Sequence, residues 1–226
     1  GQFNFVMWDI PHGNLAPWAE QILARTGVTV HLSGGQRPPD FVAANEIAWV
    51  PYTTRILTPK DDKGVMKPAC WNDEPMIQAH VDKIVSNYVP SRQHGVFVYS
   101  LGDEGDVRGS CLSPYCLAAY RRYLQGEYQD IAALNASWGT TYASFADVQL
   151  GRADDNEEAD SLRAGNFPRW YDRQAYQSHN FCKLCERFGK GFRTIDPQSR
   201  CGFEGAGTFG AADDLDGFVR SNTFWS

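Results

Sequence analysis

The sequence has no excess of basic charge and no long hydrophobic run. It holds 21 Lys and Arg residues against 27 Asp and Glu residues, a formal net charge of -6 over 226 residues. Nucleic-acid binding depends on a basic surface, so we expect no nucleic-acid partner. No apolar stretch approaches the ~18 residues of a membrane-spanning helix, so we expect no membrane partner. The first residues are typical of a strand rather than of a signal peptide, and the compartment stays open.

The sequence also lacks a glycine-rich dinucleotide fingerprint after any predicted strand, so no redox cofactor is expected. Its six cysteines include one tight pair, Cys182 and Cys185, but lack the second equally tight pair that a zinc knuckle needs. Cys182 and Cys185 lie three apart on an amphipathic helical segment and are expected to face the core as small hydrophobic residues. We therefore expect no metal with complete tetrahedral coordination from this chain alone. A disulfide between Cys111 and Cys116, which are five apart across Pro114, is left open.

Aromatic residues are the abundant class. They make up 13% of the chain, with seven Trp and ten Tyr. Such rings pack in cores, but they also line the concave sites that bind sugars and other flat-faced ligands.

Strand and helix patterns alternate along the chain. Strands are predicted at residues 3–8, 28–32, 47–52, 96–102, 200–203 and 222–225. Helices are predicted at residues 15–25, around 77–88, and at 114–125, 131–138, 168–194 and 215–219, while 151–165 is predicted as an acidic, turn-rich excursion. This alternation predicts a parallel α/β fold, most simply a (β/α)8 TIM-type barrel. About six of the eight units are present, so residues 1–226 are predicted to be one partial, truncated TIM barrel.

The fourth predicted strand runs directly into two acids. Residues 96–105 read VFVYSLGDEG, an apolar run that ends at Asp103 and Glu104. A rigid strand whose carboxyl end opens onto solvent can hold an acid at the mouth of a parallel sheet. Glu104 is therefore the first candidate for catalysis. The alternative is that both acids only begin a solvated loop.

Other polar and aromatic side chains follow the remaining strands. Asp9 and His12 come after the first strand, and Trp71 lies in the loop before the third long helix. Glu204 ends the fifth strand and Trp225 lies on the sixth. Active sites of such barrels gather at the carboxyl ends of the strands, so each is a candidate substrate contact. For His12, capping of loop backbone groups is an equal alternative.

A specific resemblance begins after the acid-bearing strand. Residues 120–124 read YRRYL, Tyr128 follows, and residues 131–142 read IAALNASWGTTY. This block resembles the segment after the fourth barrel strand in glycoside hydrolase family 42 β-galactosidases and related clan A enzymes. The order of acid-bearing strand, cysteine-containing loop, this block, long helix and further strand agrees as well, over roughly residues 97–225. Periodicity alone predicts only two core-facing helices here.

The resemblance implies a retaining glycoside hydrolase that acts on β-linked, galactoside-like sugars in an oligosaccharide or polysaccharide. Glu104 matches the general acid/base at the end of strand four. The nucleophile of the resembled families ends strand seven, which would lie beyond Ser226. The resemblance therefore implies that this chain needs the remainder of the barrel for activity. Assembly into a homo-oligomer is left open.

The chain departs from the family pattern in two places. Asp103 stands where clan A enzymes usually carry an Asn that binds the sugar 2-hydroxyl, and it adds a like charge beside Glu104. Family members often hold zinc with a tight cysteine cluster, and only Cys111 and Cys116 are comparable here. One alternative is a catalytically silent carbohydrate-binding barrel. A weaker one is a metal-assisted hydrolase that uses Asp9, His12, Asp103 and Glu204 but lacks the usual paired histidines.

Overall fold

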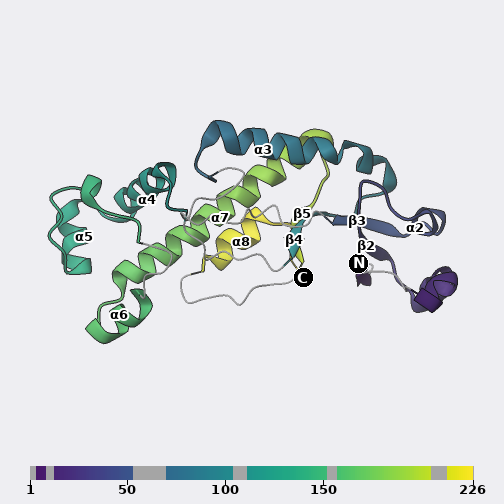
Figure 1. The fold of residues 1–226 in the computed structure, drawn as a ribbon, viewed down its shortest axis with the longest axis horizontal. Coiled ribbons are helices and arrows are strands. Elements are labelled where there is room, and N and C mark those ends of the chain that lie inside the picture. The colour runs from purple at the N-terminus through teal and green to yellow at the C-terminus, as the bar shows by residue number, and fades with distance from the viewer. Residues whose placement is uncertain are drawn as a thin grey trace.

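The computed structural model describes residues 4–8, 13–52, 70–103, 111–151, 157–204 and 213–225. The molecule is elongated, with the strands toward one end and helices α4, α5 and α6 gathered at the other (Figure 1). The long helix α7 (Pro168–Ile195) runs diagonally between the two ends.

Within the described residues, six strands lie in two parallel three-stranded sheets that meet edge to edge. The strands are β1 (Val6–Trp8), β2 (Val30–Gly34), β3 (Ala48–Tyr52), β4 (Tyr99–Asp103), β5 (Cys201–Glu204) and β6 (Phe224–Trp225). The sheets have the orders β1-β2-β3 and β4-β5-β6, with every pair parallel. A parallel bridge between Trp49 and Val96 joins β3 to the segment that leads into β4. The strands thus follow one another in chain order, as alternating β/α units require.

The helices follow from local sequence signals. The remaining α-helices are α1 (Ala19–Thr26), α2 (Asp40–Ala44), α3 (Glu74–Asn87), α4 (Pro114–Glu127), α5 (Ile131–Trp138), α6 (Glu157–Ala164) and α8 (Leu215–Ser221). Short 3-10 helices are η1 (Gly13–Trp18), η2 (Val89–His94) and η3 (Phe145–Asp147). Ser113 caps α4 and Asp130 caps α5 by accepting backbone N–H groups, and Gly139 ends α5 at a φ of 68°. Among the described residues, no helix is long and apolar enough to cross a membrane.

The two faces of the central strands pack against different sets of side chains. One face packs on α7: Tyr99 stacks on Phe192 with ring centroids 4.4 Å apart, and Phe203 packs on Phe181 at 5.3 Å. The other face carries a separate cluster that contains Val30, Leu32, Val50 and Val98. Because side chains alternate along a strand, Ser100 shares the face of Val98, and the face covered by α7 takes Tyr99.

Most predicted elements are confirmed, with three differences. Residues 157–164 form helix α6 inside the stretch predicted to be turn-rich, because Glu157 pairs with Arg169 and Arg173 of α7 at 3.1 and 2.9 Å. The short helix α2 was not predicted, since five residues carry too little periodicity. The helix predicted at 15–25 begins as η1, with α1 occupying only its second half. The polar loop at 53–69 lies outside the described residues.

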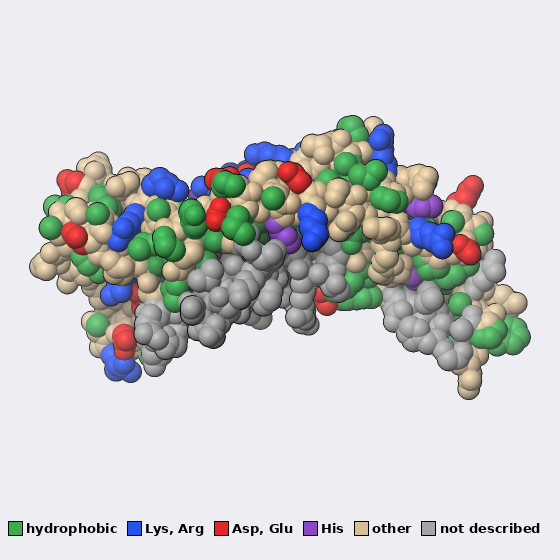
Figure 2. Space-filling view, turned by 45° about the horizontal axis from the view of Figure 1, so that its top comes forward, with side chains coloured by type: hydrophobic (Ala, Val, Ile, Leu, Met, Phe, Trp, Pro, Cys, Tyr) green, Lys and Arg blue, Asp and Glu red, His purple; other side chains and the backbone are tan. Residues whose placement is uncertain are grey.

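Charges of both signs are interspersed on the face drawn in Figure 2, and neither sign forms an extended field there.

Candidate functional site

The carboxyl ends of the parallel strands meet at one edge of the sheet. Asp103 is the last residue of β4 and pairs in register with Glu204, the last residue of β5. The register between the two strands shifts between Ser100 and Asp103, and Gly102 adopts a φ of 128° within this shift. The end of β4 is therefore irregular in a way that suits glycine. Glu104, Asp9 and His12 lie outside the described residues.

Glu204 is a buried carboxyl beside this irregular strand end. Its side chain is 2% exposed, and Ser100 Oγ donates a hydrogen bond of 2.5 Å to its Oε2. Ser100 Oγ in turn accepts from the backbone N–H of Gly102 at 3.2 Å. The second oxygen, Oε1, has no hydrogen-bond partner among the described residues. The pKa of the Glu204 carboxyl is raised to about 7; burial is the largest cause, the bond from Ser100 and a backbone hydrogen bond oppose it, and the charge of Asp103 adds a smaller upward contribution.

The two candidate tryptophans are held in packing contacts. Trp71 is 6% exposed and packs on Phe181 of α7, with ring centroids 6.3 Å apart. Trp225 packs on Phe203 and Phe218 at 5.5 and 5.6 Å, on the side of the strands that α7 and α8 cover. These contacts favour core packing for both rings. A contact of either ring with substrate stays a prediction.

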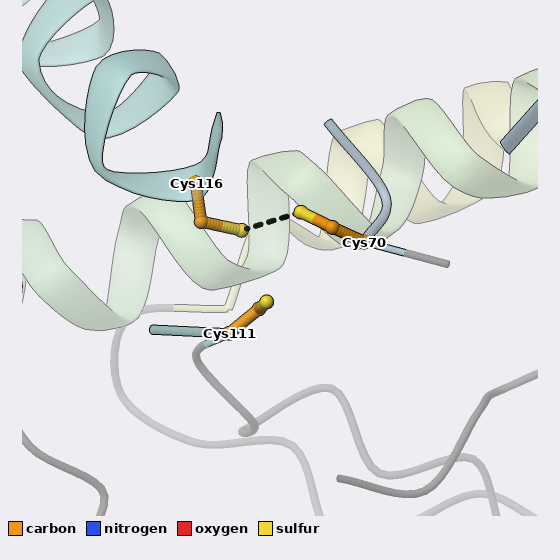
Figure 3. Close-up of side chains that lie close together, drawn as sticks. All are labelled: Cys70, Cys111 and Cys116. Atoms are coloured by element: carbon orange, nitrogen blue, oxygen red, sulfur yellow. Dashed lines mark hydrogen bonds between the residues drawn. The ribbon is translucent and has the colours of Figure 1, made fainter. Parts of the chain in front are cut away.

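Three cysteines that are distant in sequence converge in the structure. The Sγ atoms of Cys70, Cys111 and Cys116 all lie within 4.8 Å of one another, and all three residues are buried. Figure 3 shows the three side chains pointing toward one another from the loop before α3, the loop before α4 and the first turn of α4. The three cysteines are scattered in the sequence, but folding brings Cys70 Sγ to within 3.6 Å of Cys116 Sγ. Cys201 lies apart from them on β5.

Neutral polar groups surround the three thiols. Ser113 Oγ donates to Cys70 Sγ at 2.9 Å, and Asn72 Nδ2 donates to Cys116 Sγ at 3.1 Å. The adjacent Cys111 thiol, the Cys70 thiol and burial raise the pKa of the Cys116 thiol far above its usual value. None of the six cysteines is in a disulfide, so the disulfide left open between Cys111 and Cys116 is not formed in the structure. Cys182 and Cys185 face the core as predicted.

Several residues that shape the site were not predicted as site residues. Ser100 interrupts an otherwise apolar strand, and that interruption is the signal that could have marked it. Trp8 and Tyr52 end β1 and β3, and their rings lie 6.0 Å apart at the same edge as Asp103. Cys70 could not be grouped with the other two cysteines, because a separation of more than forty residues carries no spacing signal.

The comparisons with known proteins decide the family. The sequence model of glycoside hydrolase family 42, described as beta-galactosidase, matches residues 57–183, more than half of the chain. The chain belongs to glycoside hydrolase family 42. The match contains the acid-bearing strand, the three clustered cysteines and the block at 120–142, so the predicted resemblance is confirmed. Comparison of the sequence with curated proteins gives no match.

Solved structures show the same fold at low identity. The β-galactosidase of the psychrophilic Marinomonas ef1 matches with a TM-score of 0.67 and 15% identity over 98% of this chain and 40% of that one. The β-galactosidase of Halorubrum lacusprofundi gives a TM-score of 0.63 and 15% identity over 98% and 39%. An exo-carrageenase of Bacteroides ovatus gives 0.56 and 17% over 98% and 32%. These neighbours are TIM-barrel glycosidases, and this family 42 chain spans about two fifths of the length of the two β-galactosidases.

The cysteine cluster fits part of the zinc coordination that the family resemblance implies. Zinc takes four ligands in structural sites, and thiolates are among its preferred ones. Cys70, Cys111 and Cys116 supply three such ligands among the described residues. The nearest further polar groups are the hydroxyl of Ser113 and the amide of Asn72, which are neutral. The described residues thus fit three positions of a zinc tetrahedron with thiolates.

Proposed function

We propose that this family 42 chain is part of the catalytic domain of a retaining glycoside hydrolase that cleaves β-linked, galactoside-like sugars. The single observation that carries the proposal is the position of Asp103 at the carboxyl end of a buried parallel strand within the family match. Active sites of such barrels gather at this edge, and Glu104 is the next residue in the sequence. We also propose that the fold is a (β/α)8 barrel of which this chain supplies about six units.

In this proposal Glu104 protonates the leaving oxygen and later activates water. A retaining mechanism needs a second carboxylate about 5–5.5 Å away as nucleophile. We assign it to a part of the barrel outside this chain, since the chain spans only about two fifths of the β-galactosidases that it resembles. Asp9, His12, Asp103, Trp71, Glu204 and Trp225 are proposed to contact the sugar or to support those that do.

The test is Glu104→Gln in the full-length protein. We expect turnover of galactosides with poor leaving groups to be abolished, while the first step for activated aryl galactosides is largely retained, because an aryl oxide of low pKa departs without a proton. Added azide should partly restore turnover by attacking the glycosyl-enzyme in place of the activated water. The near-isosteric change limits any effect on folding.

Two outcomes would contradict the assignment. If Glu104→Gln left every substrate unaffected, Glu104 would be a bystander and the alternative of a carbohydrate-binding barrel would gain support. If the loss were equal for every leaving group and azide had no effect, the nucleophile role would move to Glu104 or to Asp103.

A further inference from the structure

Glu204 stands out as a buried acid that the general acid/base proposal does not use. At 2% exposed, its carboxyl has one oxygen bonded to Ser100 and the other without a partner among the described residues. A buried carboxyl in such a state costs free energy of folding. If the residue only filled space in the core, an apolar side chain would stabilise the fold more than a buried carboxyl does. Val98, two residues before Ser100, is an apolar residue on this face.

The contacts of Glu204 lead into the end of β4. Ser100 has a single hydroxyl proton, and it is donated to Glu204 Oε2 at 2.5 Å. The same hydroxyl oxygen accepts the N–H of Gly102 at 3.2 Å, inside the register shift that precedes Asp103. Because Ser100 can donate only one proton, the acceptor on Glu204 fixes its rotamer and so fixes the acceptor of Gly102.

The conformation held in this way is an unusual one. Gly102 has a φ of 128°, a region that other residues rarely adopt, and the pairing of β4 with β5 is irregular there. An irregular strand end must be held by specific contacts, since regular ladder bonds are missing. Asp103 follows Gly102 directly and ends β4, so its placement depends on the backbone conformation of Gly102.

We propose that Glu204 is a positioning residue that, through Ser100 and the Gly102 amide, holds the irregular end of β4 and so positions Asp103, the residue that directly precedes Glu104 in the sequence. The inference rests on the proposed function for its catalytic consequence and on the two hydrogen bonds for its structural part. Among the described residues, the one charged group that acts on the Glu204 carboxyl is Asp103, from β4. In this proposal Glu204 acts by holding the backbone at the end of β4, and its carboxyl forms and breaks no covalent bond in the reaction.

The variants are chosen by which contact each removes, and all are made in the full-length protein. Glu204→Ala removes the acceptor of the Ser100 hydroxyl, and Ser100→Ala removes the hydroxyl that joins Glu204 to the Gly102 amide. Glu204→Gln keeps an acceptor oxygen for Ser100 at the same distance. Matched controls are Glu186→Ala on α7 and Ser86→Ala on α3, because both are exposed residues far from the strand ends. We expect Glu204→Ala and Ser100→Ala each to lower kcat at least tenfold with KM changed less than threefold, and Glu204→Gln to retain most of kcat.

The double variant gives the sharpest kinetic readout. If Glu204 acts through Ser100, the combination of both alanine changes should be no worse than the more severe single change. Additive losses would overturn the proposal. A Glu204→Gln variant as inactive as Glu204→Ala would also overturn it, because the carboxylate itself would then be taking part in the reaction.

A second readout needs no activity and so separates this inference from the proposed function. Hydrogen exchange of the peptide that covers residues 97–104, followed by mass spectrometry, should be faster in Glu204→Ala and Ser100→Ala and unchanged in Glu204→Gln and both controls. If the wild-type protein cleaves no glycoside but this exchange pattern holds, the proposed function fails and the positioning role stands. Exchange that is unchanged in Glu204→Ala overturns the positioning role whatever the activity.

Discussion

At the scale of single residues, burial favours the protonated form of the Glu204 carboxyl and of the buried Cys182 thiol. Burial raises the pKa of the Glu204 carboxyl to about 7 and that of the Cys182 thiol to about 11. The neighbouring thiol of Cys111, ahead of burial itself, raises the pKa of Cys70. A metal that binds the three clustered thiols must therefore displace their protons, and its affinity should rise with pH.

The thiol cluster predicts how zinc binding responds to one added ligand. With three thiolates, the wild-type protein should lose zinc on dialysis, whereas Ser113→Cys adds a fourth thiol beside Cys70 and should retain about one equivalent. Elemental analysis after dialysis measures this, and the retained fraction should be higher at pH 8 than at pH 6. Ser86→Cys, on the exposed side of α3, is the control for an extra thiol elsewhere. One equivalent of zinc in the dialysed wild-type protein would show that a fourth ligand already exists.

The sequence was informative about single residues only where neighbours in the chain act together. Asp103 and Glu104 could be singled out because an apolar strand leads into them. The link between Ser100 and Glu204 could not be predicted, because it joins residues 104 positions apart whose contact depends on the register of β4 and β5. The same reason hid the approach of Cys70 to Cys116.

At the scale of elements, the block that revealed the family acts through structure. Asn135 Oδ1 accepts from the N–H of Tyr142 and the hydroxyl of Thr140 at 2.9 and 2.8 Å, which closes the turn after α5. Trp138 Nε1 and Tyr128 Oη both donate to one oxygen of Asp172 on α7, at 2.8 and 2.5 Å. These bonds hold α4 and α5 against α7, so this part of the family pattern encodes packing.

Helix and strand positions could be predicted well, because they rest on short-range periodicity and caps. The bounds of α5 agree at both ends, and α7 begins at Pro168 as its first-turn proline indicated. Helix α6 was missed although it has acids in its first turn and Arg163 in its last, and the ion pairs that join Glu157 to α7 could not be read from the sequence. The approach of β5 to β6 was equally hidden, since it depends on where two strands pair.

Substitution by alanine should lower the unfolding free energy at Gly202, where β5 approaches β6 closely, and raise it at Gly126. A Cβ on Gly202 would lie 1.7 Å from the carbonyl oxygen of Phe224 on β6, a backbone atom that cannot turn away. Gly202→Ala should therefore cost about 3 kcal/mol of unfolding free energy. Gly126, in the last turn of α4, has open space around its Cα, so Gly126→Ala should add about 0.5–1 kcal/mol. Urea unfolding of both variants measures the difference, and a neutral Gly202→Ala would mean that β5 and β6 are further apart than the structure has them.

At the scale of the whole molecule, the two three-stranded sheets meet at a single tryptophan. The backbone N–H of Trp49 donates to Gly95 O at 3.2 Å, and the N–H of Phe97 donates to Trp49 O at 2.7 Å. The indole is fully buried, and its Nε1 donates to Ser33 Oγ on β2 at 3.0 Å. Continuity of the sheet from β3 to β4, and with it the common edge that collects Tyr52 and Asp103, depends on this junction.

Trp49→Ala should therefore lower the free energy of unfolding of both sheets together. It opens a cavity of indole size at the junction and leaves Ser33 without its donor, so we expect a loss of about 3–5 kcal/mol in unfolding free energy. Trp18→Ala, at a position 54% exposed in η1, is the matched control and should change the free energy by about 0.5 kcal/mol or less. Chemical denaturation followed by circular dichroism compares the two. Because the junction couples the sheets, the Trp49 variant should keep one transition at a lower midpoint; two separate transitions would instead show that β1-β2-β3 and β4-β5-β6 unfold independently.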